Sequence, residues 1–236
     1  MKMRSKMFRF AFGQAFPIVI SYLFLGLAAG VLLVGAGYPP YFSTVSAMLI
    51  YGGSMQIVMV PMLTSHMPLW LVALMTLLVN GRYLFYGISL VYKYRDMGKF
   101  YPYMVYSTTD ETYSLQCSLK IPDGFDKRMT RFLIQVICHS SWIIGCSAGA
   151  FVGAALPFDL TGIEFTATAL FVVIAVDQWR SAKTHIPAII GMVSSVVFYL
   201  TLGADNFILP ALAVSAVSLM LMRDRIEMKK GGGTNE

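Results

Sequence analysis

The chain contains few charged residues. Only 13% of its 236 residues are Asp, Glu, Lys or Arg, whereas 57% are hydrophobic. A soluble globular domain averages about 25% charged residues, so this composition excludes an ordinary soluble protein and indicates an integral membrane protein. The net charge of +6 does not indicate nucleic-acid binding, because the basic residues lie at the ends of apolar stretches, where they can contact the inner leaflet.

The chain also lacks the patterns of known catalytic and metal sites. Its three cysteines, Cys117, Cys138 and Cys146, have no metal-ligand spacing, and we expect them only to pack. It contains no phosphate-binding loop, H-E-x-x-H pattern, G-x-S-x-G elbow or aspartate-rich diphosphate motif. We therefore expect no enzyme, no cofactor and no metal ion, and ATP-driven transport would require another chain.

Long apolar stretches, by contrast, cover most of the sequence. A hydrocarbon core of about 30 Å requires roughly 20 apolar residues in a helix. The stretches that reach or approach this length are 12–36, 41–63, 67–92, 131–156, 164–179, 186–202 and 207–222. We therefore expect an all-α, polytopic membrane protein with six to seven transmembrane helices. Residues 1–236 are expected to form a single transmembrane domain.

The lysines and arginines favour one topology. Such residues in short loops stay on the cytoplasmic side of a membrane. With the basic N-terminus (1–11) placed inside, loop 93–130 lies outside with its six basic residues if the first three apolar stretches all cross. If 41–63 instead enters and leaves on one side, that loop becomes cytoplasmic, as does the flexible tail (224–236). Every basic residue except Arg82 then lies inside, so we predict six crossings and one re-entrant element.

Segment 41–63 carries local signs of a break. Pro39 and Pro40 precede it, and Gly52-Gly53-Ser54 interrupts it. A glycine weakens a helix by about 1 kcal/mol, and broken backbone at membrane depth must line protein or a water-filled cavity. The alternative is a continuous helix whose glycines allow close packing.

The cytoplasmic loop 93–130 contains a polar segment, 104–120. As a further crossing this segment would leave Lys93, Arg95 and Lys99 outside, so we expect it to be amphipathic or re-entrant.

Small residues repeat every four positions in two of the stretches. They are Gly26 and Gly30 in the first stretch, and Gly145, Gly149 and Gly153 in the fourth. This spacing places them on one helix face and lets another helix approach closely, so we interpret both rows as packing surfaces. His139 and His185, near the ends of spans, are expected to be hydrogen-bonded interfacial side chains.

Three polar clusters are candidate substrate sites. In the first, a helix that begins at Gly52-Gly53-Ser54 would present free backbone N–H groups to a carboxylate, with Gln56 nearby. The second contains Asn80 and Arg82, and Arg82 lies about ten residues, or roughly 15 Å, from the cytoplasmic end of its span. A buried arginine requires a partner or an aqueous cavity, although it could also form a structural ion pair or snorkel to the surface.

The third cluster runs from Ser107 to Thr112. Thr109 could cap a helix that begins with Asp110 and Glu111. Alternatively, one of these acids faces Arg82 or a substrate ammonium group, where its pKa would be raised and it could couple to protons.

These clusters resemble the AzlC family, the large subunits of two-component branched-chain amino acid exporters of bacteria and archaea. The matching stretches are Tyr-Gly-Gly-Ser-Met-Gln at 51–56, Asn-Gly-Arg-Tyr-Leu-Phe-Tyr-Gly-Ile-Ser-Leu at 80–90, Thr-Thr-Asp-Glu-Thr-Tyr at 108–113 and Gly-Gln-Ala-Phe-Pro at 13–17. The sequence differs at Met55, where the family has small residues, and at Tyr83, where it has histidine. These differences bear on substrate range and on a proton relay through position 83.

The resemblance implies a secondary exporter in the bacterial or archaeal cytoplasmic membrane, with both termini cytoplasmic. It implies outward transport of valine, leucine, isoleucine or similar amino acids, driven by the proton gradient, and a small AzlD-like membrane subunit of about a hundred residues. It also assigns roles in the substrate site to residues that match its pattern, namely Gln56, Asn80, Arg82, Asp110 and Glu111. A non-transporting scaffold subunit, a channel or carrier for another solute, and a homo-oligomer remain open alternatives.

Overall fold

The computed structural model describes residues 2–65, 67–155, 172, 175–176, 179–180, 184–203 and 207–222. All regular elements in these residues are helices, which confirms the all-α class. The chain divides into two compact units, Met1–Ala167 and Thr168–Glu236. The predicted stretch 164–179 and the tail 224–236 lie largely or wholly outside the described residues, and a single domain over the whole chain stays a prediction.

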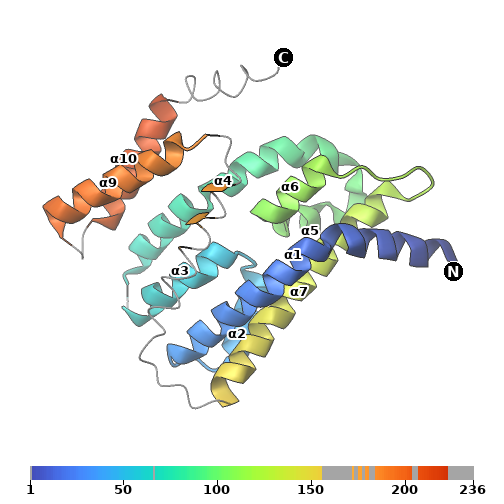
Figure 1. The fold of residues 1–236 in the computed structure, drawn as a ribbon, viewed down its shortest axis with the longest axis horizontal. Helices are drawn as coiled ribbons and strands as arrows, with labels where there is room; N and C mark the ends of the chain where they lie inside the picture. Colours follow the sequence, from blue (N-terminus) through green and yellow to red (C-terminus); the bar gives the residue numbers. More distant parts are fainter. Residues whose placement is uncertain are drawn as a thin grey trace. The chain divides into compact units, whose positions relative to one another are not determined.

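The first unit contains eight of the described elements (Figure 1). They are α1 (Lys2–Gly35), α2 (Pro40–Leu49), α3 (Gly53–Thr64), α4 (Leu69–Tyr94), the 3-10 helix η1 (Arg95–Phe100), α5 (Tyr101–Tyr106), α6 (Asp110–Ser118) and α7 (Lys127–Ala155). In the second unit, α9 (Ile186–Leu202) and α10 (Ile208–Leu221) pack against each other.

Two described helices, Ser5–Gly35 and Lys127–Ala155, are long and apolar enough to cross a membrane. Shorter apolar helices cover Gly53–Thr64, Leu69–Gly81 and Ile186–Leu202. This pattern agrees with a membrane protein, while the number of crossings stays a prediction. Helix α1 begins well before the predicted stretch 12–36, so much of the predicted N-terminal segment 1–11 is helical.

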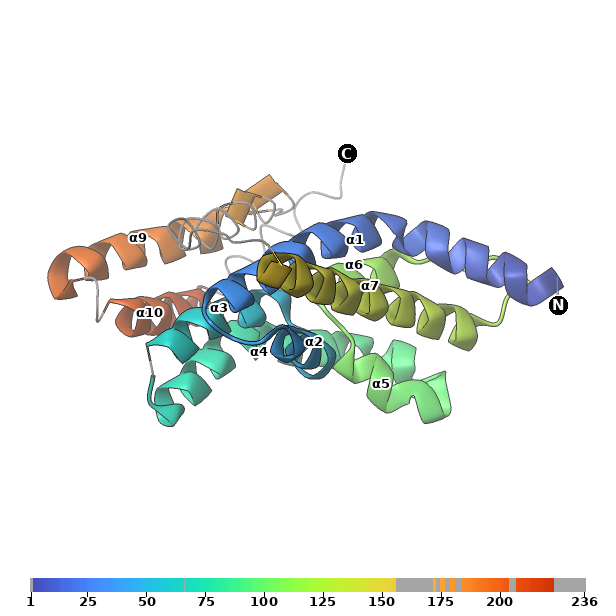
Figure 2. The same ribbon diagram turned by 90° about the horizontal axis from the view of Figure 1, so that it is seen from below.

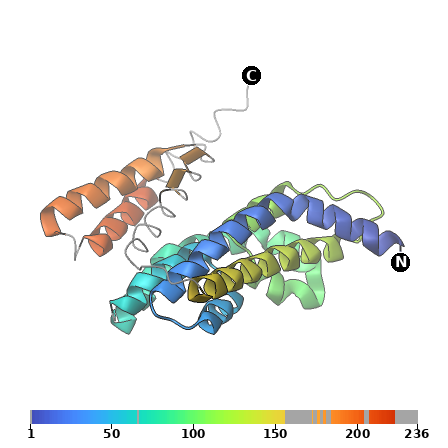
Figure 3. The same ribbon diagram turned by 60° about the horizontal axis from the view of Figure 1, so that its bottom comes forward.

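Helices α1 and α7 run side by side along most of their lengths (Figure 3). A Cβ atom added at Gly30 or Gly149 would lie within 3.0 Å of backbone atoms of the other helix, closer than real Cβ atoms approach. The glycine rows therefore bring the two backbones into direct contact, which confirms the predicted packing surfaces.

The glycine contacts also give the relative direction of α1 and α7. Gly26 faces Gly145, Gly30 faces Gly149, and Val31 faces Gly153. Residue numbers rise together along both helices, so the helices are parallel.

Segment 41–63 is broken, as predicted. Helix α2 ends at Leu49, and α3 begins at Gly53 after a short connection. Within this connection Tyr51 has φ of +43°, which is rare for a residue with a side chain and costs of order 1–2 kcal/mol. The uninterrupted helix considered from the sequence is therefore wrong.

The two halves of this segment, the α2–α3 hairpin, pack differently: α2 lies against α7, whereas α3 contacts α1 and α4 (Figure 2). Ser43 Oγ on α2 donates to the Cys146 carbonyl at 3.2 Å, whereas Gln56 on α3 bonds to Trp142. The α2–α3 connection thus reaches Trp142, which lies near the middle of α7. Helix α3 then leads back toward the end of the unit where α1 finishes (Figure 1).

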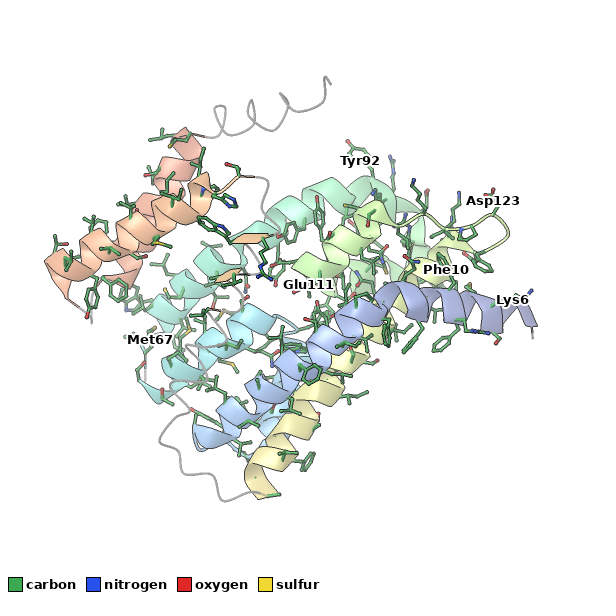
Figure 4. All side chains as sticks on the ribbon, viewed as in Figure 1. Lys6, Phe10, Met67, Tyr92, Glu111 and Asp123 are labelled. Atoms are coloured by element: carbon green, nitrogen blue, oxygen red, sulfur yellow. The ribbon has the colours of Figure 1, made fainter. Side chains whose placement is uncertain are left out.

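Loop 93–130 contains only short helices. Helix α5 has six residues and α6 has nine, about 14 Å at 1.5 Å per residue, so neither spans a hydrocarbon core of about 30 Å. The ring of Phe125 in this loop lies 5.6 Å from the ring of Phe10 near the start of α1. Figure 4 labels Phe10 and Asp123 at this shared end of the unit.

Candidate binding site at the helix break

A chain of hydrogen bonds fixes the hairpin to α7. Trp142 Nε1 donates to Gln56 Oε1 at 2.6 Å, and Gln56 Nε2 donates to Ser46 Oγ at 3.1 Å. Gln56 is only 5% exposed, and both ends of its amide are used. In this structure Gln56 therefore joins the two half-helices and α7, and its predicted contact with substrate stays a prediction.

Two aromatic residues connect the third predicted cluster, 107–112, to these hydrogen bonds. The rings of Trp142 and Tyr22 lie 5.5 Å apart in a T-shaped arrangement, and Tyr22 on α1 is buried. The Tyr22 hydroxyl donates to Glu111 Oε2 at 2.8 Å and also bonds to the Thr109 hydroxyl. Glu111, labelled in Figure 4, is exposed at the start of α6, so this carboxylate is within reach of an entering molecule.

Helix α6 begins with the predicted cap. Thr109 and Thr112 form a capping box in which the Thr109 N–H donates to Thr112 Oγ1 at 2.8 Å. Asp110 and Glu111 occupy the first turn, where the positive end of the helix dipole favours carboxylates. The capping interpretation is confirmed, and Glu111 is additionally oriented by Tyr22.

Replacing Thr109 by alanine removes the cap and one partner of the buried Tyr22 hydroxyl. We expect the free energy of unfolding to fall by about 1 kcal/mol, as for loss of other N-cap hydroxyls. Thr109→Ser, which keeps the hydroxyl, should change it much less. Denaturant titration of both purified variants measures the difference, and equal losses would contradict the capping role.

The second predicted cluster, on α4, contacts α6. The rings of Tyr86 and Tyr113 stack with centroids 4.4 Å apart, and Tyr86 also packs against Tyr83. Asn80 is half-buried, and its Oδ1 atom has no hydrogen-bond partner in the part of the chain that the structure describes. The Arg82 side chain lies outside the described residues, so its pairing with Asp110 or Glu111 stays a prediction.

At the break, the C-terminal end of α2 faces the N-terminal end of α3. Gly52 caps α3 without a side chain, and the bulk of Trp142 lies against Gly53, 3.1 Å from the position of an added Cβ. The Tyr106 hydroxyl on α5 donates to the Met48 carbonyl in the last turn of α2. The N-terminal end of α3 carries partial positive charge and the C-terminal end of α2 partial negative charge.

Beside this break, two buried polar atoms have no hydrogen-bond partner within the described residues. They are the Tyr51 hydroxyl and Nε2 of His139, from side chains that are 4% and 7% exposed. Their rings lie 4.2 Å apart. Buried polar groups are normally paired, so two such atoms beside opposed helix ends point to a polar ligand or water that completes the site.

His139 is held from α5. Its Nδ1 atom lies 3.0 Å from the Tyr103 hydroxyl. Burial raises the pKa of Tyr103 to about 12, so this hydroxyl keeps its proton and can donate. The prediction that His139 is hydrogen-bonded is confirmed, but the side chain is buried beside the helix break. His185, in the second unit, stacks on Trp179.

The structure thus brings most predicted site residues into one region. Gly52, Gly53, Ser54 and Gln56 lie at the start of α3, and Asp110 and Glu111 at the start of α6, with Tyr22 and Trp142 between the two helices. Sequence reasoning missed Tyr22 and Trp142. Both lie four residues before a packing residue, Gly26 or Cys146, and this spacing was the one available signal that they face the α1–α7 interface.

No group of three or more His, Cys, Asp or Glu side chains suited to a metal ion occurs among the described residues. The polar groups at the break are hydroxyl, amide, imidazole and backbone groups, with the carboxylates of Asp110 and Glu111 at the edge. Such an arrangement suits reversible binding of a small charged molecule.

Comparison with known proteins identifies the family. The family model described as AzlC protein matches residues 17–156. The chain is 33% identical to the branched-chain amino acid transport protein AzlC of Bacillus subtilis (strain 168), over 93% of this chain and 87% of that protein. It is 34% identical to an uncharacterized membrane protein of Haemophilus influenzae, over 92% of this chain and 90% of that protein.

A more distant relative is the inner membrane protein YgaZ of Escherichia coli (strain K12), 27% identical over 79% of this chain and 80% of that protein. No solved structure matches the chain. The family match covers more than half of the sequence, and of these relatives two are named membrane proteins and one a transport protein. The chain belongs to the AzlC family.

Proposed function

We propose that this protein is a secondary transporter that exports branched-chain or related hydrophobic amino acids across the cytoplasmic membrane. The family indicates membrane transport, and the relative from Bacillus subtilis is named for branched-chain amino acids. Proton coupling, and a small AzlD-like second membrane subunit, belong to the same proposal.

The observation that carries the proposal is the pair of opposed helix ends at residues 50–53. An amino acid is a zwitterion, so its site needs positive and negative partners a few ångströms apart. The N–H groups at the start of α3 suit the carboxylate, as they do at broken helices in other transporters. Arg82 is the alternative partner for the carboxylate.

Glu111 or Asp110 meets the substrate ammonium group. Glu111 is oriented by the buried Tyr22 hydroxyl, and Tyr22 packs against Trp142 beside the α3 terminus. Buried apolar side chains on α3, such as Met55 and Ile57, are available to the aliphatic group. Binding would shift the transporter between its two states only through different affinities for them.

The direction of the helices supports the proposed topology. If α2–α3 crossed the membrane fully, α1 and α7 would run in opposite directions, whereas the glycine contacts make them parallel. A re-entrant hairpin between α1 and α4 adds no crossing, so α1 and α7 would then cross the membrane in the same direction. The Phe10–Phe125 contact places loop 93–130 at the same end as the N-terminus, in agreement with the distribution of lysine and arginine.

The test is transport in membrane vesicles that contain this chain with the proposed small subunit. Labelled valine, leucine, isoleucine and methionine are loaded, and efflux is followed under an imposed proton gradient. We expect gradient-stimulated efflux of at least one of them when both chains are present. No movement of any amino acid rejects the proposal, and ion currents without amino acid movement favour a channel.

Replacing Glu111 by glutamine should lower the rate of transport at least about tenfold, because it removes the charge that pairs with the substrate ammonium group. Asp123→Asn, in an exposed part of loop 93–130, is the matched control and should leave transport unchanged. If both variants transport equally well, Glu111 is not part of the site. A scaffold subunit would predict normal efflux in both.

A further inference from the structure

We propose that His139 is the residue that binds and releases the proton exchanged for the substrate. This inference deepens the proposed export function and rests on it. The expectation from sequence placed any coupling proton on Asp110 or Glu111, and the structure offers a second group, buried at the helix break itself.

The position of His139 suits this role. It is the thirteenth residue of α7, roughly 18 Å from the helix start at 1.5 Å per residue, and its ring touches the connection between α2 and α3 at Tyr51. Histidine is the side chain whose ordinary titration spans the physiological pH range. A proton bound here would therefore change the contacts between α7 and the α2–α3 connection.

The hydrogen bonds of the ring change when it is protonated. In the neutral ring one nitrogen donates and the other accepts, whereas the protonated ring donates from both. Nδ1 is engaged by Tyr103, and Nε2 is buried without a partner among the described residues. Because Nδ1 accepts from the Tyr103 hydroxyl in the neutral ring, Nε2 carries the hydrogen in that state. A further proton binds at Nδ1, and the Tyr103 hydroxyl must then turn so that its oxygen accepts from Nδ1–H.

The nearest acceptors belong to the end of α2. The backbone of Ala47 and Met48 lies against the ring, and the last carbonyls of a helix carry partial negative charge. The positive charge of the protonated ring would strengthen its attraction to these carbonyls and draw the last turn of α2 toward α7. The Met48 carbonyl is also bound by Tyr106, so α5 is coupled to the same movement.

The groups that face His139 are mostly neutral. They are Tyr51 from the α2–α3 connection and Tyr103 and Tyr106 from α5. The carboxylate of Glu111 acts on both Tyr51 and Cys138 from the start of α6. An imidazolium at position 139 and a substrate ammonium at Glu111 would repel each other in this low-dielectric region.

Proton and substrate would therefore occupy the site in turn. Mutually exclusive binding of two ligands is what exchange in opposite directions requires, because the protein then carries either the proton or the substrate across, never both at once. A proton taken up outside and released inside would then drive the amino acid outward.

The experiment separates exchange from coupling. Vesicles with both chains are assayed for exchange of labelled for unlabelled leucine at equal pH, and for net efflux under a pH gradient. In the unaltered protein we expect the gradient to stimulate efflux about fivefold or more. His139→Asn keeps an acceptor for Tyr103 but cannot titrate, so its efflux should show no stimulation by the gradient and a flatter pH profile, relative to its own exchange rate.

The control is His185→Asn, which alters a histidine of the second unit and should keep both the stimulation and the pH profile. If His139→Asn keeps its stimulation, the inference is overturned while the export function stands. If the unaltered protein exchanges no amino acid, both the proposed export function and this inference are overturned.

A second variant tests the inference in case the His139→Asn protein does not fold. Tyr103→Phe leaves the imidazole in place and removes the hydroxyl bound to Nδ1, so the midpoint of the pH profile should move by about half a unit or more. If the His139→Asn protein is not recovered folded and the Tyr103→Phe profile equals that of the unaltered protein, the inference is likewise overturned.

Discussion

The Gly149→Ala variant is expected to lose about 3 kcal/mol or more of its free energy of unfolding. A Cβ atom at this position would meet the backbone of Leu27, and a backbone cannot move aside as a flexible side chain can. Because folded proteins are stable by only about 5–15 kcal/mol, this is a large share of the total. Unfolding in mixed micelles, followed by circular dichroism or protease resistance, measures the loss.

Two other glycines provide a graded control. An added Cβ at Gly153 would lie 3.3 Å from Val31, a tight contact that a small shift can relieve, so Gly153→Ala should cost less. Gly13 on α1 has nothing within 4 Å of the added atom, and Gly13→Ala should be neutral or stabilise by up to about 1 kcal/mol. Equal effects at all three positions would contradict direct backbone contact between α1 and α7.

The Gln56→Leu variant is expected to lose about 3 kcal/mol of stability together with most of its transport. Leucine leaves Trp142 Nε1 buried without its acceptor and Ser46 without its donor, and each unsatisfied buried group costs about 1–3 kcal/mol. The two half-helices would no longer be tied to each other and to α7. Unfolding and leucine exchange are measured on the same preparations.

A second substitution distinguishes this structural role from substrate binding. Adding Trp142→Phe to Gln56→Leu removes the unpaired N–H, so the double variant should be about 1–2 kcal/mol more stable than the sum of the single losses predicts. If Gln56 instead binds substrate in the resting structure, Gln56→Leu would weaken substrate affinity and leave unfolding unchanged. Gln14→Leu, on an exposed face of α1, is the matched control and should change stability by less than about 0.5 kcal/mol.

Local features of the fold could be predicted from the sequence. The helix break follows from adjacent glycines, and the cap at Thr109 follows from a threonine before two acids, because both effects act over one helical turn. The close approach of two helices follows from glycines spaced by four, since this spacing places them on one face. The partner helix of each row could not be read from spacing alone.

The candidate site was predictable only in part. Glu111 was identified from its motif, yet its hydrogen-bond partner is Tyr22, which lies 89 residues away in the chain. Gln56 was expected to be available to substrate, and its amide is bonded to Trp142, 86 residues away. No local pattern encodes such pairs, because they depend on how the parallel helices α1 and α7 align.

The sequence by itself indicated that this chain belongs in a membrane, that the helix at 41–63 breaks at its glycines, and which helix faces are flat enough for close packing. These properties follow from hydropathy, helix propensity and residue size, which act over a few neighbouring positions. Only the tertiary structure decided that Tyr22, Trp142 and His139 surround the helix break. That arrangement depends on the alignment of α7 with α1 and the hairpin, which bring together side chains from distant parts of the chain.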